Sequence, residues 1–261
     1  MTLLLAIILG VIQGLTEFLP VSSSGHLALF GAWLGLEQAD IQFDILIHLA
    51  TLVAILIVYK KDVLDLAKAP FNKDPKALKL MGMLIIVTIP AVVVGLLLKS
   101  YVEFFHNDLI WVAAFLGVTG LVLLSGKVLK QNQRSRIENL NLIPVLLIGC
   151  AQAFAILPGI SRSGMTIMAG LFLGLEKEEA ARFSFLMAIP AIAGAGILMV
   201  RDMNVTQLGQ LWVPYAGGFI VSLLAGLVAL KVLIHILKGQ RFFLFGFYCL
   251  ALAGVTLFVS I

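Results

Sequence analysis

QGLTEFLPVSSSGH, residues 13–26, is a polar break inside an apolar region that extends over residues 3–36. The apolar run before the break forms a helix of about 15 Å, whereas the hydrocarbon layer of a bilayer is about 30 Å thick. A second break, LPGISRSG at residues 157–164, interrupts the apolar region 143–175. We therefore expect each region to form two half-helices around a polar break that is buried in protein or lines a wet cavity.

The composition places the whole chain in a membrane. Of its 261 residues, 61% are hydrophobic and 12% are charged, whereas a soluble domain is about half apolar and about a quarter charged. The apolar runs are long and unbroken, which excludes the short alternating strands of a membrane β-barrel. Six runs are long enough for membrane-spanning helices, at residues 43–59, 80–98, 110–126, 183–199, 213–230 and 242–260. The sequence predicts an all-α, polytopic membrane protein.

The charged residues predict an orientation and exclude a nucleic-acid-binding surface. The net charge is only +4, and the basic residues gather in the loops 60–79 and 127–142, which two spans separate. These loops therefore share a side, which the positive-inside rule makes cytoplasmic, so both chain termini are expected outside. Cys150 and Cys249 lie inside apolar runs and offer neither a disulfide framework nor metal-ligand spacing.

The two interrupted regions are copies of each other. Residues 7–37 align without a gap with residues 146–176, and ten of the 31 aligned positions are identical. The identical pairs include Gly10 with Gly149, Gln13 with Gln152, Ser22 with Ser161, Ser24 with Ser163 and Gly25 with Gly164. Each copy is followed by three spans, an odd number, so the second half is expected to be inverted. We predict one membrane domain, 1–261, with repeats 1–126 and 143–261 joined by the basic loop 127–142.

If the two breaks meet, they form one polar pocket at membrane depth. Gln13 and Glu17 are four residues apart and share a helix face, and the second break adds Arg162. Half-helix N-termini favour anions, and arginine binds phosphate with two parallel hydrogen bonds. Ser23 beside His26 is a nucleophile–base arrangement, and a carboxylate can hold a divalent cation or act as a base. Together these groups suit phosphoryl transfer.

Simpler interpretations exist for the same residues. Ser24 and Ser163 look most like helix caps, and Arg162 could pair with Glu17 for structural reasons alone. His48 lies in the middle of a span and is expected to be a packed or hydrogen-bonded histidine. An inverted repeat with broken helices is also the pattern of secondary transporters, and a lipid flippase could use the same anion site.

At these residues the sequence resembles the undecaprenyl-diphosphate phosphatase family, which is associated with bacitracin resistance. QGLTEFLPVSSSGH is similar to the first signature of the family and LPGISRSG to the second, and the likeness extends over nearly the whole chain. The resemblance implies hydrolysis of a C55 isoprenyl diphosphate to the monophosphate, which recycles the lipid carrier for cell-wall synthesis. It implies a multi-pass protein of the bacterial cytoplasmic membrane whose partners are the polyprenyl lipid and the bilayer. The oligomeric state stays open, a homodimer included.

The resemblance also implies roles for the residues of both breaks. The catalytic residues would be Ser23, His26, Glu17 and Arg162, and the substrate-binding residues would be Ser22, Gly25, Ser161, Ser163 and Gly164. Ser22 and His26 remain alternative nucleophiles. The family depends on a divalent cation, Mg²⁺ or Ca²⁺, which Glu17 and Gln13 would hold. Many members have Glu where this chain has Gln13, so only one carboxylate remains here. Because the first region enters from outside, the active site is expected to open to the outer face.

Overall fold

The computed structural model describes residues 1–36, 40–106, 108–129, 135–201, 205–239 and 242–260. Twelve α-helices lie in these ranges: α1 (Leu3–Phe18), α2 (Ser23–Trp33), α3 (Ile41–Val58), α4 (Lys60–Asn72), α5 (Pro75–Leu97), α6 (Lys99–His106), α7 (Leu109–Ser125), α8 (Leu142–Phe154), α9 (Arg162–Phe172), α10 (Lys177–Arg201), α11 (Val205–Lys238) and α12 (Leu244–Ser260). The described ranges contain no β-strand beyond one isolated bridge, between Ser135 and Leu175. The predicted all-α class is confirmed.

Each of the six predicted spans corresponds to one helix, namely α3, α5, α7, α10, α11 and α12. Within the described residues, five helices are long and apolar enough to cross a membrane, and α12 is a shorter apolar helix. The chain is therefore a multi-pass membrane protein. Helix α11 extends beyond the predicted span 213–230 at both ends, because its ends carry polar residues that a search for apolar length leaves out.

The prediction of a loop at 60–79 is wrong, because α4 and the start of α5 occupy it. Helix α5 begins at Pro75, and the Asp74 carboxylate accepts hydrogen bonds from the amides of Lys76 and Ala77. An acidic cap followed by proline is a strong helix start. Within the loop 127–142, residues 130–134 lie outside the described part of the chain, as does residue 37 at the end of the first repeat copy.

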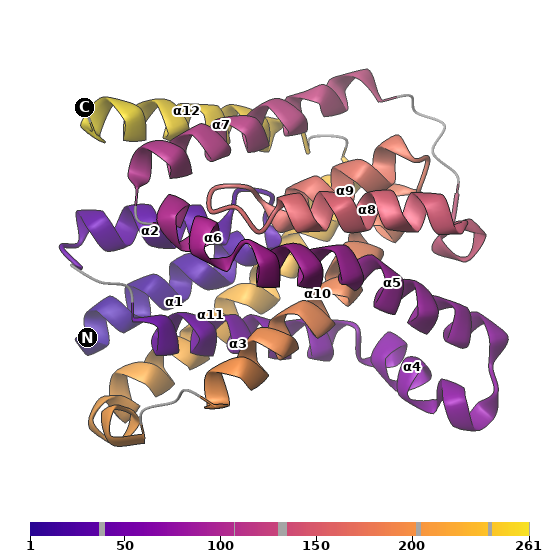
Figure 1. Ribbon diagram of the computed structural model, residues 1–261, viewed down its shortest axis with the longest axis horizontal. Coiled ribbons are helices and arrows are strands. Elements are labelled where there is room, and N and C mark those ends of the chain that lie inside the picture. The colour runs from indigo at the N-terminus through magenta and orange to yellow at the C-terminus, as the bar shows by residue number, and fades with distance from the viewer. Residues whose placement is uncertain (37–39, 107, 130–134, 202–204, 240–241, 261) are drawn as a thin grey trace.

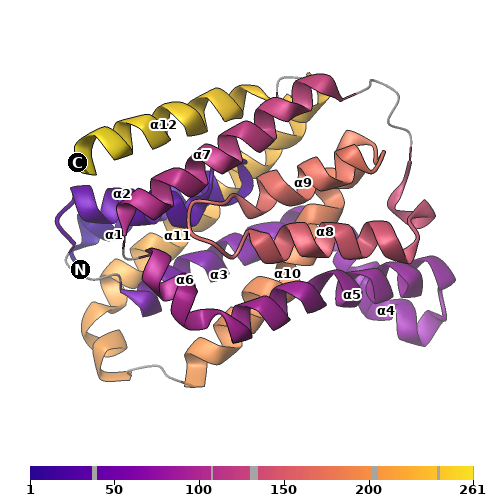
Figure 2. The same ribbon diagram turned by 45° about the horizontal axis from the view of Figure 1, so that its top comes forward.

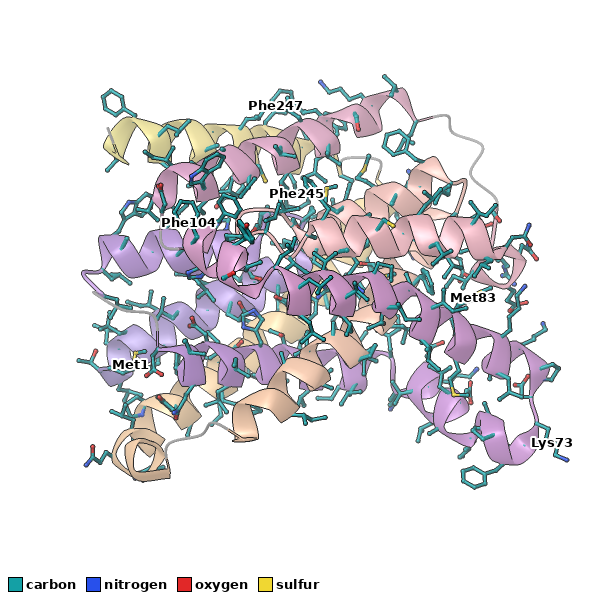
Figure 3. The ribbon with its side chains drawn as sticks, viewed as in Figure 1. Met1, Lys73, Met83, Phe104, Phe245 and Phe247 are labelled. Carbon is teal, nitrogen blue, oxygen red and sulfur yellow. The ribbon has the colours of Figure 1, made fainter. Side chains whose placement is uncertain are left out.

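Both interrupted regions are a helix, a break and a second helix, as predicted. Figures 1 and 2 show α1 and α2 at the end of the molecule that carries the N-terminus, and α8 and α9 at the opposite end. The two breaks face each other in the middle. The end of α12 lies at the same end of the molecule as the N-terminus (Figure 1), and Figure 3 places Met1 and Lys73 at opposite ends. This is the arrangement expected of two re-entrant pairs. The inverted repeat and its boundaries stay predictions.

Glycines allow the broken helices to pack tightly against long ones. A Cβ added at Gly10 of α1 would lie 2.6 Å from the carbonyl oxygen of Gly218 in α11. A Cβ added at Gly149 of α8 would lie 2.8 Å from the carbonyl oxygen of Val87 in α5. Such close backbone approach is how helices associate in membranes. Gly10 and Gly149 are aligned in the repeat, so the two copies fix their first half-helix in the same way.

Candidate active site

The first break turns the chain sharply at Ser22. The backbone of Ser22 is in the left-handed region, with φ 68°, which is uncommon for a residue other than glycine. Its hydroxyl accepts a hydrogen bond from the amide of Gly25 at 3.2 Å and so caps α2. The prediction that Ser24 is the cap is wrong, and its hydroxyl instead lies 3.3 Å from that of Ser22.

The second break is held by Thr119 of α7. The Thr119 hydroxyl donates to the carbonyl oxygen of Gly159 at 2.9 Å and accepts from the amide of Ser161 at 3.0 Å. Gly159 has φ 97°, a conformation that glycine adopts without strain. Ser161 caps α9 by accepting from the amide of Gly164 at 3.1 Å. The cap is therefore Ser161 and not, as predicted, Ser163.

The two breaks meet, as predicted. The hydroxyl of Ser163 donates to the carbonyl oxygen of Leu19 at 3.2 Å, and Gly25 approaches Gly159 so closely that a Cβ would lie 3.2 Å from the Cα of Gly159. The N-termini of α2 and α9, whose dipoles and free amides favour anions, are thereby brought together. The residues expected to bind substrate all lie at this junction: Ser22, Gly25, Ser161, Ser163 and Gly164.

Glu17 of α1 is the centre of the junction. One carboxylate oxygen, Oε1, accepts from Nη2 of Arg162 at 2.5 Å. The other, Oε2, accepts from the hydroxyl of Ser23 at 2.7 Å and from Nε2 of Gln13 at 3.1 Å. Nη1 of Arg162 donates to the carbonyl oxygen of Ser184 at 3.1 Å. The predicted meeting of Arg162 and Glu17 across the two breaks is confirmed, and Glu17 is almost fully buried.

The hydrogen-bond partners of His26 do not include Ser23, the serine that was expected to pair with it. Its Nδ1 lies 2.8 Å from the carbonyl oxygen of Ser22, and its Nε2 lies 2.7 Å from the hydroxyl of Tyr248. Since a carbonyl only accepts, Nδ1 carries the proton and Nε2 accepts from Tyr248. The expected hydrogen-bonded pair of Ser23 and His26 is therefore not formed in this structure, because the Ser23 hydroxyl donates its hydrogen bond to Glu17.

Two further side chains reach the site without having been predicted there. His48 of α3 places Nε2 3.7 Å from Oε2 of Glu17, while its Nδ1 donates to the carbonyl oxygen of Asp44 at 2.7 Å. That bond confirms the prediction of a hydrogen-bonded histidine. The only feature of the sequence that could have indicated the proximity of His48 to Glu17 was an ionisable group in the middle of a span. Tyr248 comes from α12, 222 residues beyond His26. A tyrosine in an apolar run gives no signal of its partner.

The donors available for a divalent cation are Gln13 and Glu17. Among the described residues, no group donates to Oε1 of Gln13, although this oxygen is buried. No three His, Cys, Asp or Glu side chains gather into a metal site within the same residues. Magnesium commonly takes only one or two protein oxygens and completes its shell with water and substrate phosphates. The free amide oxygen beside a carboxylate fits a cation of that kind.

Comparison with known proteins finds similarity over nearly the whole chain. A family model described as Bacitracin resistance protein BacA matches residues 6–255. A protein of Syntrophotalea carbinolica, named Undecaprenyl-diphosphatase, is 41% identical over 265 residues and covers all of both chains. One of Methanococcus maripaludis with the same name is 40% identical over 243 residues, which are 93% of this chain and 94% of that protein. Another of Desulfosudis oleivorans is 41% identical over 268 residues, 97% of each.

Proposed function

This chain belongs to the bacitracin resistance protein BacA family, and on that premise we propose that it hydrolyses undecaprenyl diphosphate to undecaprenyl phosphate and inorganic phosphate. The activity is the one for which its relatives are named. The observation that carries the proposal is the Glu17 carboxylate, which binds the Ser23 hydroxyl on one side and the Arg162 guanidinium on the other. A nucleophile, a base and a phosphate-binding group thus share one site, and transport alone needs no nucleophile.

In the first step, Ser23 attacks the terminal phosphorus of the lipid diphosphate. The proton of its hydroxyl passes to Glu17, which already accepts it at 2.7 Å. The bond from that phosphorus to the bridging oxygen breaks, and undecaprenyl phosphate leaves. Arg162 and the N-termini of α2 and α9 stabilise the charge on the transferring phosphoryl group. The phosphate competes with Glu17 for the guanidinium and so frees the carboxylate to act as a base.

In the second step, water releases the phosphate from Ser23. The water oxygen bonds to phosphorus, the bond from phosphorus to the serine oxygen breaks, and Glu17 returns its proton to that oxygen. One proton of the water stays on the released phosphate, and the other is taken up by His26 at Nε2, the nitrogen that accepts the hydrogen bond of Tyr248, because Nδ1 already carries a proton. Ser23 rather than Ser22 is the nucleophile in this scheme, since the Ser22 hydroxyl is buried and caps α2.

Purified protein in detergent is expected to release inorganic phosphate from the C55 diphosphate in a stoichiometry of one phosphate per lipid. Free phosphate and lipid monophosphate are measured together over time. A transporter or flippase without hydrolytic activity would release neither. The hydrolase proposal is rejected if the folded protein releases no phosphate but moves the lipid between the leaflets of a vesicle. That result would favour a lipid flippase.

A divalent cation, Mg²⁺ or Ca²⁺, would be held by Oε1 of Gln13 and by Glu17, together with oxygens of the diphosphate. When bound, it would neutralise charge on the phosphate oxygens. Gln13→Glu is expected to lower the cation concentration that gives half-maximal activity by about tenfold, because a second carboxylate strengthens an oxygen site. The measurement is phosphate release during titration of each cation into chelator-treated protein.

Gln152→Glu is the matched control, since Gln152 is aligned with Gln13 in the repeat and is also buried. This variant adds the same negative charge, but not beside Glu17, so its cation requirement should equal that of the unaltered protein. An unchanged requirement in Gln13→Glu, or full activity after chelation, would contradict the cation site.

We propose that the protein lies in the bacterial cytoplasmic membrane with both termini outside and with the site open to the outer face. The support is the Lys-rich segment 60–79, which carries Lys73 and lies at the end of the molecule opposite both chain termini (Figures 1 and 3). In a background lacking Cys150 and Cys249, an impermeant thiol reagent should label Leu34→Cys in intact cells, since Leu34 is exposed at the outer end of α2. Lys73→Cys should react only after lysis. The reverse pattern would overturn this orientation.

A further inference from the structure

Both ring nitrogens of His26 are engaged within the protein. Nδ1 is 2.8 Å from the carbonyl oxygen of Ser22, and Nε2 is 2.7 Å from the hydroxyl of Tyr248. The imidazole is only 2% exposed, whereas Tyr248 is 47% exposed. The hydroxyl of Tyr248 therefore occupies Nε2, the one ring nitrogen of His26 that can accept a proton.

The position of Tyr248 is fixed by its neighbours on α12. Cys249 is fully buried, and its thiol lies 3.7 Å from the carbonyl oxygen of Pro20 in the first break. Gly246 packs on Gly120 of α7, where a Cβ would lie 2.7 Å from the carbonyl oxygen of Gly120. Helix α7 in turn holds the second break through Thr119. The hydroxyl of Tyr248 is thus placed by contacts that do not depend on its own hydrogen bond.

The ring of Tyr248 also lies nearly parallel to that of His26, with an interplanar angle of 9° and centroids 5.7 Å apart. Phe30 lies on the same imidazole at 12° and 6.4 Å. Aromatic contacts alone would hold the histidine ring in place. The hydroxyl is therefore not needed to hold the two rings together.

We propose that Tyr248 relays the proton between His26 and the water that resolves the phosphorylated Ser23. This inference rests on the proposed hydrolase function. The water donates one proton to the oxygen of Tyr248, and the hydroxyl proton of Tyr248 passes to Nε2 of His26. The water oxygen, which keeps its other proton, bonds to phosphorus while the bond from phosphorus to the Ser23 oxygen breaks, and Glu17 returns its proton to that oxygen. The relay leaves a neutral tyrosine and an imidazolium whose Nδ1 proton still binds the carbonyl oxygen of Ser22. Tyr248 takes no part in the first step, in which Glu17 accepts the proton of Ser23.

Tyr248→Phe keeps the ring and removes the hydroxyl, so only the second step should slow. General acid–base catalysis contributes about 10²–10⁴-fold, and we expect steady-state phosphate release to fall by about 100-fold. Phosphoserine at Ser23 should then accumulate after acid quenching, which mass spectrometry of the digested protein detects. His26→Gln should accumulate the same species, and the double variant should be no slower than the slower single variant.

Tyr101→Phe is the matched control, because Tyr101 is an exposed tyrosine on α6, a helix that carries none of the site residues named above. It should match the unaltered protein in rate and in the absence of accumulated phosphoserine. If the rate of Tyr248→Phe is unchanged, or if it falls without phosphoserine, the relay is rejected. If the unaltered protein releases no phosphate, the proposed function itself has failed, which is a different result.

Discussion

Ser23→Ala is expected to lower phosphate release by about 10⁴-fold or more, because removing the nucleophile of a covalent mechanism leaves only transition-state binding. The hydroxyl of Ser23 is half-buried and lies 2.7 Å from Oε2 of Glu17. The loss of one hydroxyl on the first turn of α2 should leave the fold intact. The measurement is single-turnover phosphate release, with the helical content of the purified variant recorded alongside.

The neighbouring serines supply the controls for this variant. Ser24→Ala removes a hydroxyl that contacts Ser22 and not Glu17, so its rate should stay near that of the unaltered protein. Ser22→Ala removes the cap of α2 and should cost about 1 kcal/mol of stability, with phosphoserine still formed at Ser23. A folded Ser22→Ala protein that is inactive, beside an active Ser23→Ala protein, would assign the attack to Ser22.

The sequence was sufficient to predict the breaks, the spans and the pairing of Arg162 with Glu17. The reason is energetic: a charge at membrane depth costs about 2.5–3.5 kcal/mol on insertion scales, so two such charges in an apolar chain are expected to meet. The positions of polar residues within the apolar segments of this chain therefore indicate which distant segments meet.

The details of the site depend on geometry that no pattern supplies. Three consecutive serines can each cap α2, and the structure shows that Ser22 does so, with its backbone at a positive φ. The turn at Ser22 also directs Ser23 toward Glu17 and His26 toward α12. Short amphipathic helices such as α4 were missed for another reason, since a search for apolar length finds only spans.

Arg162→Ala is expected to lower phosphate release by about 10³-fold, the lower end of the contribution of an arginine that stabilises a transferring phosphoryl group. The guanidinium uses its two terminal nitrogens on different partners, Glu17 and the carbonyl oxygen of Ser184. Arg162→Lys keeps the charge but not this fork, so we expect an intermediate loss of about 100-fold.

The alternative role for Arg162 is structural, and direct binding of inorganic phosphate, measured by calorimetry on the purified protein, separates the two roles. Removing one partner of a buried ion pair costs about 3–5 kcal/mol, so Arg162→Ala should be less stable than the unaltered protein whichever role is correct. If Arg162 binds phosphate, Arg162→Lys should bind inorganic phosphate more weakly than the unaltered protein does. Glu17→Gln is the matched control for binding, because it removes the charge that pairs with Arg162 while it leaves the guanidinium free for phosphate. Weaker phosphate binding in Arg162→Lys but not in Glu17→Gln assigns the guanidinium to the substrate, whereas unchanged binding in Arg162→Lys would make Arg162 a structural partner of Glu17.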